Sequence, residues 1–174
     1  MKTLKEHIIE GLKIGANTKV NTHSYHPKTN KELKELIDEL IKERGNDANL
    51  NDIDTSKITD MSGLFFASEF NGDISRWDVS NVTSMCNMFA YSEFNGDISE
   101  WDVSNVNDMR FTFGGSKFNG NISKWDVSKV TNMRGMFIRS GFKGDISGWD
   151  VSNVKDMHEM FFGSPLQKNP PKWY

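Results

Sequence analysis

Tryptophan recurs every 24 residues along most of this chain, and this period constrains the fold more than any other feature. The tryptophans are Trp77, Trp101, Trp125, Trp149 and Trp173. Two further columns keep the same step: Phe65, Phe89, Phe113, Phe137 and Phe161 form one, and Phe70, Phe94, Phe118, Phe142 and Leu166 form the other. A unit of this size cannot bury its apolar face alone, so a fixed period predicts a stack of repeated units.

The first part of each unit has the pattern of a short strand. Ile74, Trp77 and Val79 follow an L-x-x-L-x-L rhythm, which places Trp77 and Val79 on the inner side of the strand. The alternate positions of the strand face outward in this interpretation, and they hold Arg76, Asp78 and Ser80.

The second part of the unit has the pattern of a short helix. Its apolar residues fall at i, i+3, i+6 and i+7, and they are Val82, Met85, Met88 and Phe89. Ser80 and Asn81 stand where an N-cap belongs, while Asp78 could instead close an Asx-type turn. Gly72 and its copies at 96, 120 and 144 are expected to give the backbone freedom to turn before the next strand.

The flanks have the patterns of caps. Residues 31–44 form an amphipathic helical pattern that Asn30 or Thr29 can cap and Gly45 can end. A weaker amphipathic segment covers 4–12, and 15–27 is expected to be irregular or briefly extended. At the other end Pro165, Pro170 and Pro171 are expected to seal the open edge, because proline cannot donate to a strand ladder.

The unit F-x-G-D-I-S-x-W-D-V-S-N-V-x-x-M-x-x-M-F resembles a repeat family first described as mycoplasma proteins of unknown function. The family is also called the bacterial surface-protein repeat and is related to BspA-like leucine-rich-repeat proteins. The resemblance covers residues 50–164 well and 165–174 in part. It implies a leucine-rich-repeat-like fold, often displayed on bacterial surfaces for adhesion or protein binding, and it transfers no catalytic residue.

These patterns together predict an α/β fold, a leucine-rich-repeat-like right-handed solenoid with an N-terminal helical cap. It would contain about five 24-residue units, each a short parallel strand plus a short helix. The expected divisions are a helical cap at 1–48, the repeat solenoid at 49–164 and a partial capping repeat at 165–174.

The outward positions of the predicted strand supply the candidate partner-binding residues. Arg76, Glu100 and Lys124 change charge from unit to unit, as a column that selects a partner would, although solvated positions free to vary would look the same. The neighbouring column is Asp78, Asp102, Asp126 and Asp150. We favour a role for these aspartates in corner hydrogen bonds, with calcium between adjacent carboxylates as the alternative.

The tryptophan column allows a core role or a sugar-stacking platform, and the core role is favoured. Each Trp takes an aliphatic position of the strand rhythm, and Ile53 replaces it in the first unit.

Charge and motifs argue against several function classes. Residues 49–174 carry 12 Lys/Arg against 16 Asp/Glu, which disfavours a nucleic-acid partner. Every serine of the units recurs in a column, and no nucleotide-binding or metal-protease motif is present, so no enzymatic activity, catalytic residue or cofactor is expected. His23 and His26 lack a third ligand nearby, so no metal site is expected either.

The expected function is therefore a non-catalytic binding module, a monomer that uses its strand face to bind a protein still to be identified. The alternative is a surface adhesin for a host glycan or protein, in which calcium, the Asp column or exposed aromatic residues take part. Residues 1–10 lack the apolar region of a secretory signal, and no stretch reaches the length of a membrane span. The sequence alone thus favours a soluble protein, with surface display suggested only by the family resemblance.

Overall fold

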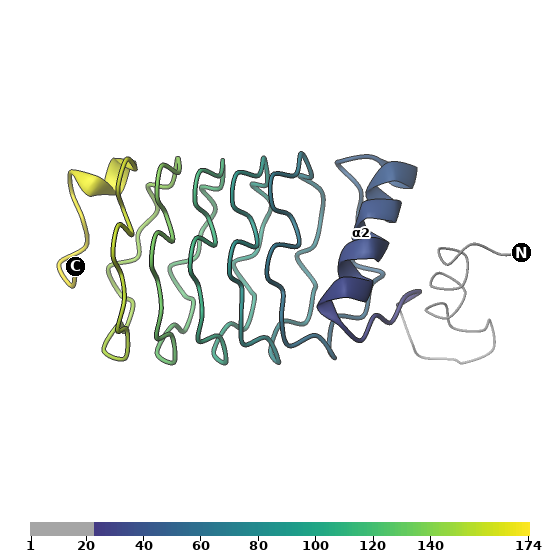
Figure 1. Cartoon of the computed structure of the whole chain (residues 1–174), viewed down its shortest axis with the longest axis horizontal. Coiled ribbons are helices and arrows are strands. Elements are labelled where there is room, and N and C mark those ends of the chain that lie inside the picture. Colours follow the sequence, from purple (N-terminus) through teal and green to yellow (C-terminus); the bar gives the residue numbers. More distant parts are fainter. Residues whose placement is uncertain (1–22) are drawn as a thin grey trace, which may run out of the picture.

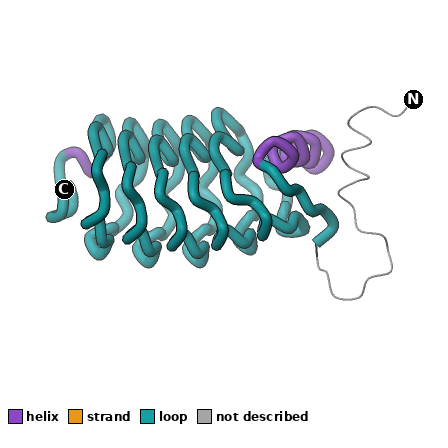
Figure 2. Tube along the Cα trace, turned by 60° about the horizontal axis from the view of Figure 1, so that its bottom comes forward, coloured by secondary structure: helices purple, strands orange, loops and turns teal. Residues whose placement is uncertain are grey.

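The computed structural model describes residues 23–174, and most of them lie in turns, bends and irregular segments. These residues include one α-helix, α2 (Asn30–Arg44), and one 3-10 helix, η1 (Pro165–Gln167). Figure 1 shows the chain after α2 as a row of similar coils, and Figure 2 shows the same coils side by side in a second view. The coils have no extended strands, and their only strand-type pairing with one another consists of isolated parallel bridges, at Asp60, Ser84, Asp108, Asn132 and Asp156 among others.

The predicted α/β solenoid of strand-plus-helix units is therefore wrong. The stretch predicted as a strand is a turn, in which the Trp77 N–H donates to the Ile74 carbonyl. The stretch predicted as a helix contains Asn87 and Tyr91 in the left-handed region, at φ 56° and 57°. A right-handed helix cannot pass through such residues, so its i→i−4 bonds do not form.

Five ladder segments, residues 60–68, 84–92, 108–116, 132–140 and 156–164, take the place of the predicted helices. In the second of them the N–H groups alternate between two kinds of acceptor. Those of Met88, Ala90 and Ser92 donate within the segment to the carbonyl three residues earlier. Those of Met85, Asn87, Phe89 and Tyr91 donate to the next ladder segment at 2.8–2.9 Å. Each segment is thus a chain of tight turns bonded to its neighbours.

Aromatic columns fill the interior of the coils. Trp101 is 4% exposed, its ring lies 6.4 Å from that of Trp77, and its Nε1 donates to the Ile74 carbonyl at 3.2 Å. The Phe89 and Phe113 rings stack at 5.6 Å. The predicted core role of the tryptophans is confirmed. Their only polar atom is paired with a backbone carbonyl, as buried indole groups require.

The column of Gly72, Gly96, Gly120 and Gly144 holds glycine because there is no room for a side chain, not because the backbone needs extra conformational freedom. Gly72 and its copies do not lie in the left-handed region. A Cβ on Gly72 would overlap the Ala48 carbonyl oxygen, and one on Gly96 would come within 2.8 Å of the Phe94 ring. The expectation that these glycines allow a turn is therefore wrong, because it is the close approach of neighbouring groups that excludes a side chain.

Helix α2 closes the first coil. Thr29 caps it by accepting a hydrogen bond from the Glu32 N–H, and Gly45 follows its end, so the predicted helix is confirmed. Its buried residues, Leu33, Leu36, Ile37 and Leu40, belong to the same core cluster as the aromatic columns. Asn30 Nδ2 also donates to the carbonyls of Asp60 and Ser62, at 3.2 and 3.0 Å. The predicted segment 4–12, and the part of 15–27 before residue 23, lie outside the described residues.

The last residues continue the aromatic core. The Trp173 ring lies 6.5 Å from that of Trp149, and its Nε1 donates to the Ile146 carbonyl at 3.0 Å. The Tyr174 ring meets the Phe161 ring edge to face at 4.9 Å. This tail therefore covers the aromatic end of the last coil.

Candidate binding surface

The column predicted to select a partner lies on turns rather than on a strand. Arg76, Glu100 and Lys124 are all exposed, each at the second position of a two-residue turn. The Arg76 N–H donates to the Asn51 side chain at 2.8 Å. These side chains are therefore accessible to a partner, but they do not lie on the β-sheet surface that the sequence predicted.

The aspartates of the neighbouring column are exposed and close Asx turns, as favoured from the sequence. In Asp78, Asp102, Asp126 and Asp150, Oδ1 accepts a hydrogen bond from the N–H of the serine two residues later, at 3.0–3.1 Å. Hydrogen bonds from Ser104 lower the pKa of Asp102, and those from Ser128 and Ser152 do the same for Asp126 and Asp150. One carboxylate oxygen of each aspartate is therefore occupied in shaping the backbone.

Within residues 23–174, no group of three or more His, Cys, Asp or Glu side chains could hold a metal ion. His26 instead bonds to a carboxylate of the first coil, with Nδ1 at 2.8 Å from Asp54 Oδ2. Over the same residues, no helix has the length and apolar character needed to cross a bilayer.

The ladder segments carry a surface that the sequence analysis missed. Two hollows of 450 Å³ and 270 Å³ lie along it and share Asn87 in their walls. The larger includes Phe66 and Arg110, and the smaller includes Tyr91, Phe111, Ile138 and Arg139. We call the two hollows together the aromatic groove.

Large apolar side chains are unusually exposed in this groove. Phe66 is 51% exposed and Tyr91 is 63% exposed, and their rings meet edge to face at 5.9 Å. Phe162, on the last ladder segment, is 47% exposed, and the Arg139 guanidinium lies 6.0 Å from the centre of its ring. Exposed aromatic rings gathered on one face are typical of a contact surface.

Two of the aromatic residues in the groove hold a backbone conformation that favours glycine. Tyr91 and Phe111 have φ of 57° and 54°, while the same columns hold Gly115 and Gly135 in the next coil. A bulky residue at positive φ is a conformational outlier. Positive φ recurs at the same two positions of every ladder segment, so the repeat's own backbone places these two rings.

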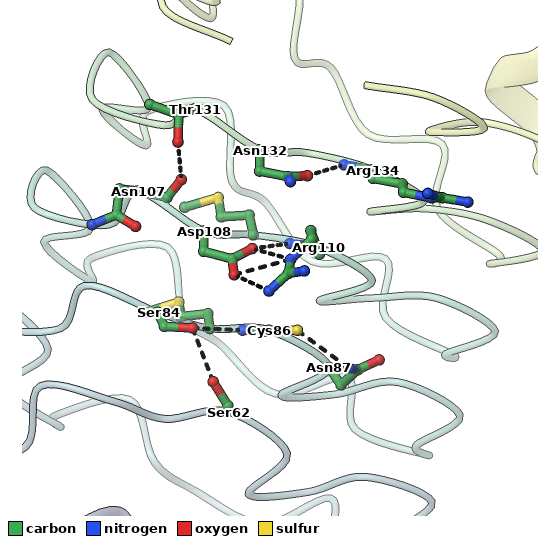
Figure 3. Close-up of polar contacts among 12 residues, drawn as sticks. Ser62, Ser84, Cys86, Asn87, Asn107, Asp108, Arg110, Thr131, Asn132 and Arg134 are labelled. Carbon is green, nitrogen blue, oxygen red and sulfur yellow. Dashed lines mark hydrogen bonds and ion pairs between the residues drawn. The ribbon is translucent and has the colours of Figure 1, made fainter. Parts of the chain in front are cut away.

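The polar rim of the groove is held in place by short-range contacts, shown in Figure 3. Arg110 Nη2 bonds to Asp108 Oδ2 at 2.7 Å, and this bond raises the pKa of the guanidinium. The Ser62 and Ser84 hydroxyls lie 2.9 Å apart, and Asn87 Nδ2 donates to Cys86 Sγ at 3.2 Å. Burial raises the pKa of the Cys86 thiol, so it is protonated at neutral pH and is not an activated nucleophile.

The missed surface has a signal in the sequence, which lies in two columns that break the repeat. The residue after the inner phenylalanine is Phe66, Ala90, Gly114, Ile138 or Phe162, and the next is Ala67, Tyr91, Gly115, Arg139 or Gly163. The columns directly before and after them, those of Phe65 and Ser68, do not change, whereas these two mix the largest and smallest side chains. Their outward direction follows from the left-handed residues, which no spacing rule reveals.

Comparison with known proteins gives a family but no characterised relative. A family model described as "Mycoplasma protein of unknown function, DUF285" matches residues 31–137 and 92–173. No curated protein and no solved structure matches the chain.

Proposed function

We propose that this chain, which belongs to the Mycoplasma protein family of unknown function DUF285, is a non-catalytic module that binds a partner protein through its aromatic groove. The observation that carries the proposal is the exposed pair Phe66 and Tyr91 above two adjoining hollows. Aromatic rings beside arginine are the residue types enriched in the contact centres of protein interfaces.

The groove supports a partner that inserts an apolar side chain. Tyr91, Phe111 and Ile138 line the smaller hollow, with Arg139 at its margin. The rings are already fixed, because Phe66 packs against Tyr91 and because the backbone beneath them is bonded from coil to coil. A contact surface that needs little ordering on binding loses less entropy, which favours affinity.

The exposed column Arg76, Glu100 and Lys124 is the competing contact surface. The charge of its three side chains alternates from positive to negative to positive on equivalent turns of successive coils, so a partner could select among them. We also propose that the chain is related to BspA-like surface proteins. This relation favours adhesion as the role of the interaction.

Two sets of variants separate the surfaces. The groove variant Phe66→Ser/Tyr91→Asn removes exposed rings and keeps a residue at position 91 that tolerates positive φ. The outer-column variant is Arg76→Glu/Glu100→Lys/Lys124→Glu. Both should melt like the parent chain, because all five side chains are exposed.

The experiment is capture of a partner, its identification by mass spectrometry, and titration of the purified partner against the three proteins. Affinity lost only in the groove variant supports the proposal. Affinity lost only in the outer-column variant moves the contact to that column. Binding of an oligosaccharide panel through Tyr91, with no protein partner, would replace the proposal with a glycan-binding role.

A further inference from the structure

The walls of the aromatic groove carry positive charge, although the coils around it are acidic. The residues that line the two hollows include Arg110 and Arg139 but no Asp or Glu. Residues 49–174 as a whole carry 12 Lys/Arg against 16 Asp/Glu, so the groove reverses the charge of its surroundings. Contact surfaces of proteins are matched in charge to their partners, and this reversal therefore bears on what the groove binds.

One of these arginines is neutralised within its own coil. Arg110 Nε donates to both carboxylate oxygens of Asp108, at 2.9 and 3.0 Å, and Nη2 donates to Oδ2 at 2.7 Å (Figure 3). Fork-like bonds of this kind are the strong form of an arginine–carboxylate pair. Arg110 therefore already has its anion and offers little charge to a partner.

The equivalent arginine of the next coil, Arg134, lacks such a carboxylate. Asn132 stands where Asp108 stands one coil earlier, and its Oδ1 accepts a hydrogen bond from the backbone N–H of Arg134 at 3.0 Å (Figure 3). An amide carries no charge, and among residues 23–174 the exposed Arg134 guanidinium forms no ion pair. The Arg134 carbonyl accepts from the Phe111 N–H at 3.0 Å, so this charge borders a residue that lines the smaller hollow.

Arg139 supplies a second free positive charge, in the wall of the smaller hollow itself. It is exposed and, within the described part of the chain, forms no ion pair. Its guanidinium lies 6.0 Å from the centre of the Phe162 ring, and a guanidinium stacked on a ring keeps the N–H groups at its edge free for a carboxylate. In the ladder segment 132–140, Arg134 comes before Ile138 and Arg139 after it, so the two free charges accompany the apolar wall of the hollow.

We propose that the groove selects an acidic segment of its partner protein, in which a large apolar side chain fills the smaller hollow and neighbouring Asp or Glu residues pair with Arg134 and Arg139. This inference rests on the proposed function, because it names the chemistry of the partner for the same groove. Carboxylates suit arginine, whose planar fork bonds both of their oxygens. A nucleic acid suits the site poorly, because two separate arginines cannot offset the repulsion of a long polyanion by the acidic coils around them.

The test selects short random peptides displayed on phage against the full chain and against the groove variant Phe66→Ser/Tyr91→Asn. Peptides recovered on the parent chain alone should carry a large apolar residue with Asp or Glu beside it. A recovered peptide is then titrated next to a copy in which Asn and Gln replace every Asp and Glu. The neutral copy should bind about fivefold more weakly or worse, and added salt should reduce the difference.

Asp108 and Asn132 offer a matched pair of variants that leaves every arginine in place. Asn132→Asp gives Arg134 the carboxylate that Arg110 already has, and it should weaken the acidic peptide about two- to fivefold. Asp108→Asn frees Arg110 and should strengthen binding by a similar factor. Each change installs a residue type that the same column already holds, so both variants should melt close to the parent chain.

The outcomes separate this inference from the proposed function. Arg139→Gln should also weaken the acidic peptide, and equal affinity of the parent chain, Arg139→Gln and Asn132→Asp for it overturns the inference. Recovered peptides that are neutral and bind the parent chain but not the groove variant overturn it too, while the groove remains a contact surface. Peptides that bind the groove variant as well as the parent, or a selection that recovers none, count against both proposals.

Discussion

The ring of Tyr91 lies directly over Gly115 of the next coil. A Cβ on Gly115 would come within 2.6 Å of Tyr91 Cδ1, and Phe111 covers Gly135 in the same way. Each large side chain at a left-handed position therefore requires a glycine one coil later. Two aromatic residues of the groove, the exposed Tyr91 and the half-buried Phe111, thus owe their placement to the residue 24 positions ahead.

Replacing Gly115 with alanine should destabilise the chain by about 1–3 kcal/mol. The new methyl group would sit at φ 65° and press on the Tyr91 ring. Thermal or urea unfolding gives the loss. In a Tyr91→Ala background the same change should cost less, because only the strain of alanine in the left-handed backbone conformation is left. Equal losses in both backgrounds would show that the ring gives way without cost.

Replacing Trp101 with alanine should cost about 3–5 kcal/mol, since it opens a large cavity in the middle of the aromatic column. Trp101→Phe keeps most of the ring and removes the Nε1 donor, which leaves the Ile74 carbonyl without its 3.2 Å bond. That variant should lose clearly less, measured by the same unfolding experiment. A Trp101→Ala chain that melts like the parent would contradict the inward placement of the tryptophans.

Glu159→Gly should stabilise the chain by about 0.5–1 kcal/mol, because relief of the left-handed backbone outweighs the greater freedom of glycine in the unfolded state. Glu159 has φ 57°, and glycine occupies the same column at Gly63 and Gly135. Among the described residues Glu159 forms one ion pair, a long one to His158 at 3.9 Å between two exposed side chains, so little is lost with it. Differential scanning calorimetry measures the change, and a lower melting temperature would show that the left-handed conformation carries no strain at this position.

Acid should weaken the corners of the coils. Hydrogen bonds from serine two residues later lower the folded-state pKa of Asp97, Asp102 and Asp126 below that of the unfolded chain. Their stabilisation is therefore present above the unfolded pKa, near pH 4, and is lost as the pH falls through the folded pKa.

Asp97→Asn should flatten this acid dependence without disturbing the fold. Asn121 already takes the equivalent position and accepts from the Ser123 N–H at 3.1 Å. Melting temperatures measured between about pH 2 and 6 should fall less steeply for the variant. Identical slopes would mean that Asp97 does not contribute to the acid sensitivity.

The sequence predicts which residues are buried far better than it predicts the backbone that buries them. The 24-residue step correctly places Trp101, Phe89 and Phe94 in the core, and the caps and stripe of residues 31–44 correctly predict α2. The apolar spacing of Val82, Met85 and Met88, however, suits tight i→i−3 turns as well as a helix. Only the left-handed conformations of Asn87 and Tyr91 decide between them, and neither residue is a glycine that would signal it.

The candidate contact surfaces are only partly predictable from the sequence. Alternation correctly places Asp78 and its copies outside, and the D-x-S pattern correctly predicts their turns. Phe66 was missed because it follows the core residue Phe65, and the direction of two adjacent phenylalanines depends on the local turn. The available signal was a variable column beside constant ones, and the prediction of a contact surface used it only for the Arg76 column.

The donor-to-acceptor bonding of the ladder segments also bears on how such a chain could change its length. Every internal junction has the same four backbone bonds and the same stacked rings, as between Phe89 and Phe113 or between Phe113 and Phe137. Duplicating or deleting one whole 24-residue block from the middle of the stack would recreate the same four backbone bonds and ring stacking, as long as a glycine still follows each large left-handed side chain, and would leave α2 and the tail at Trp173 with the neighbours they have now. An insertion of any other size would shift every ring out of its column. Evolution and protein engineering can therefore lengthen this molecule only in steps of one coil.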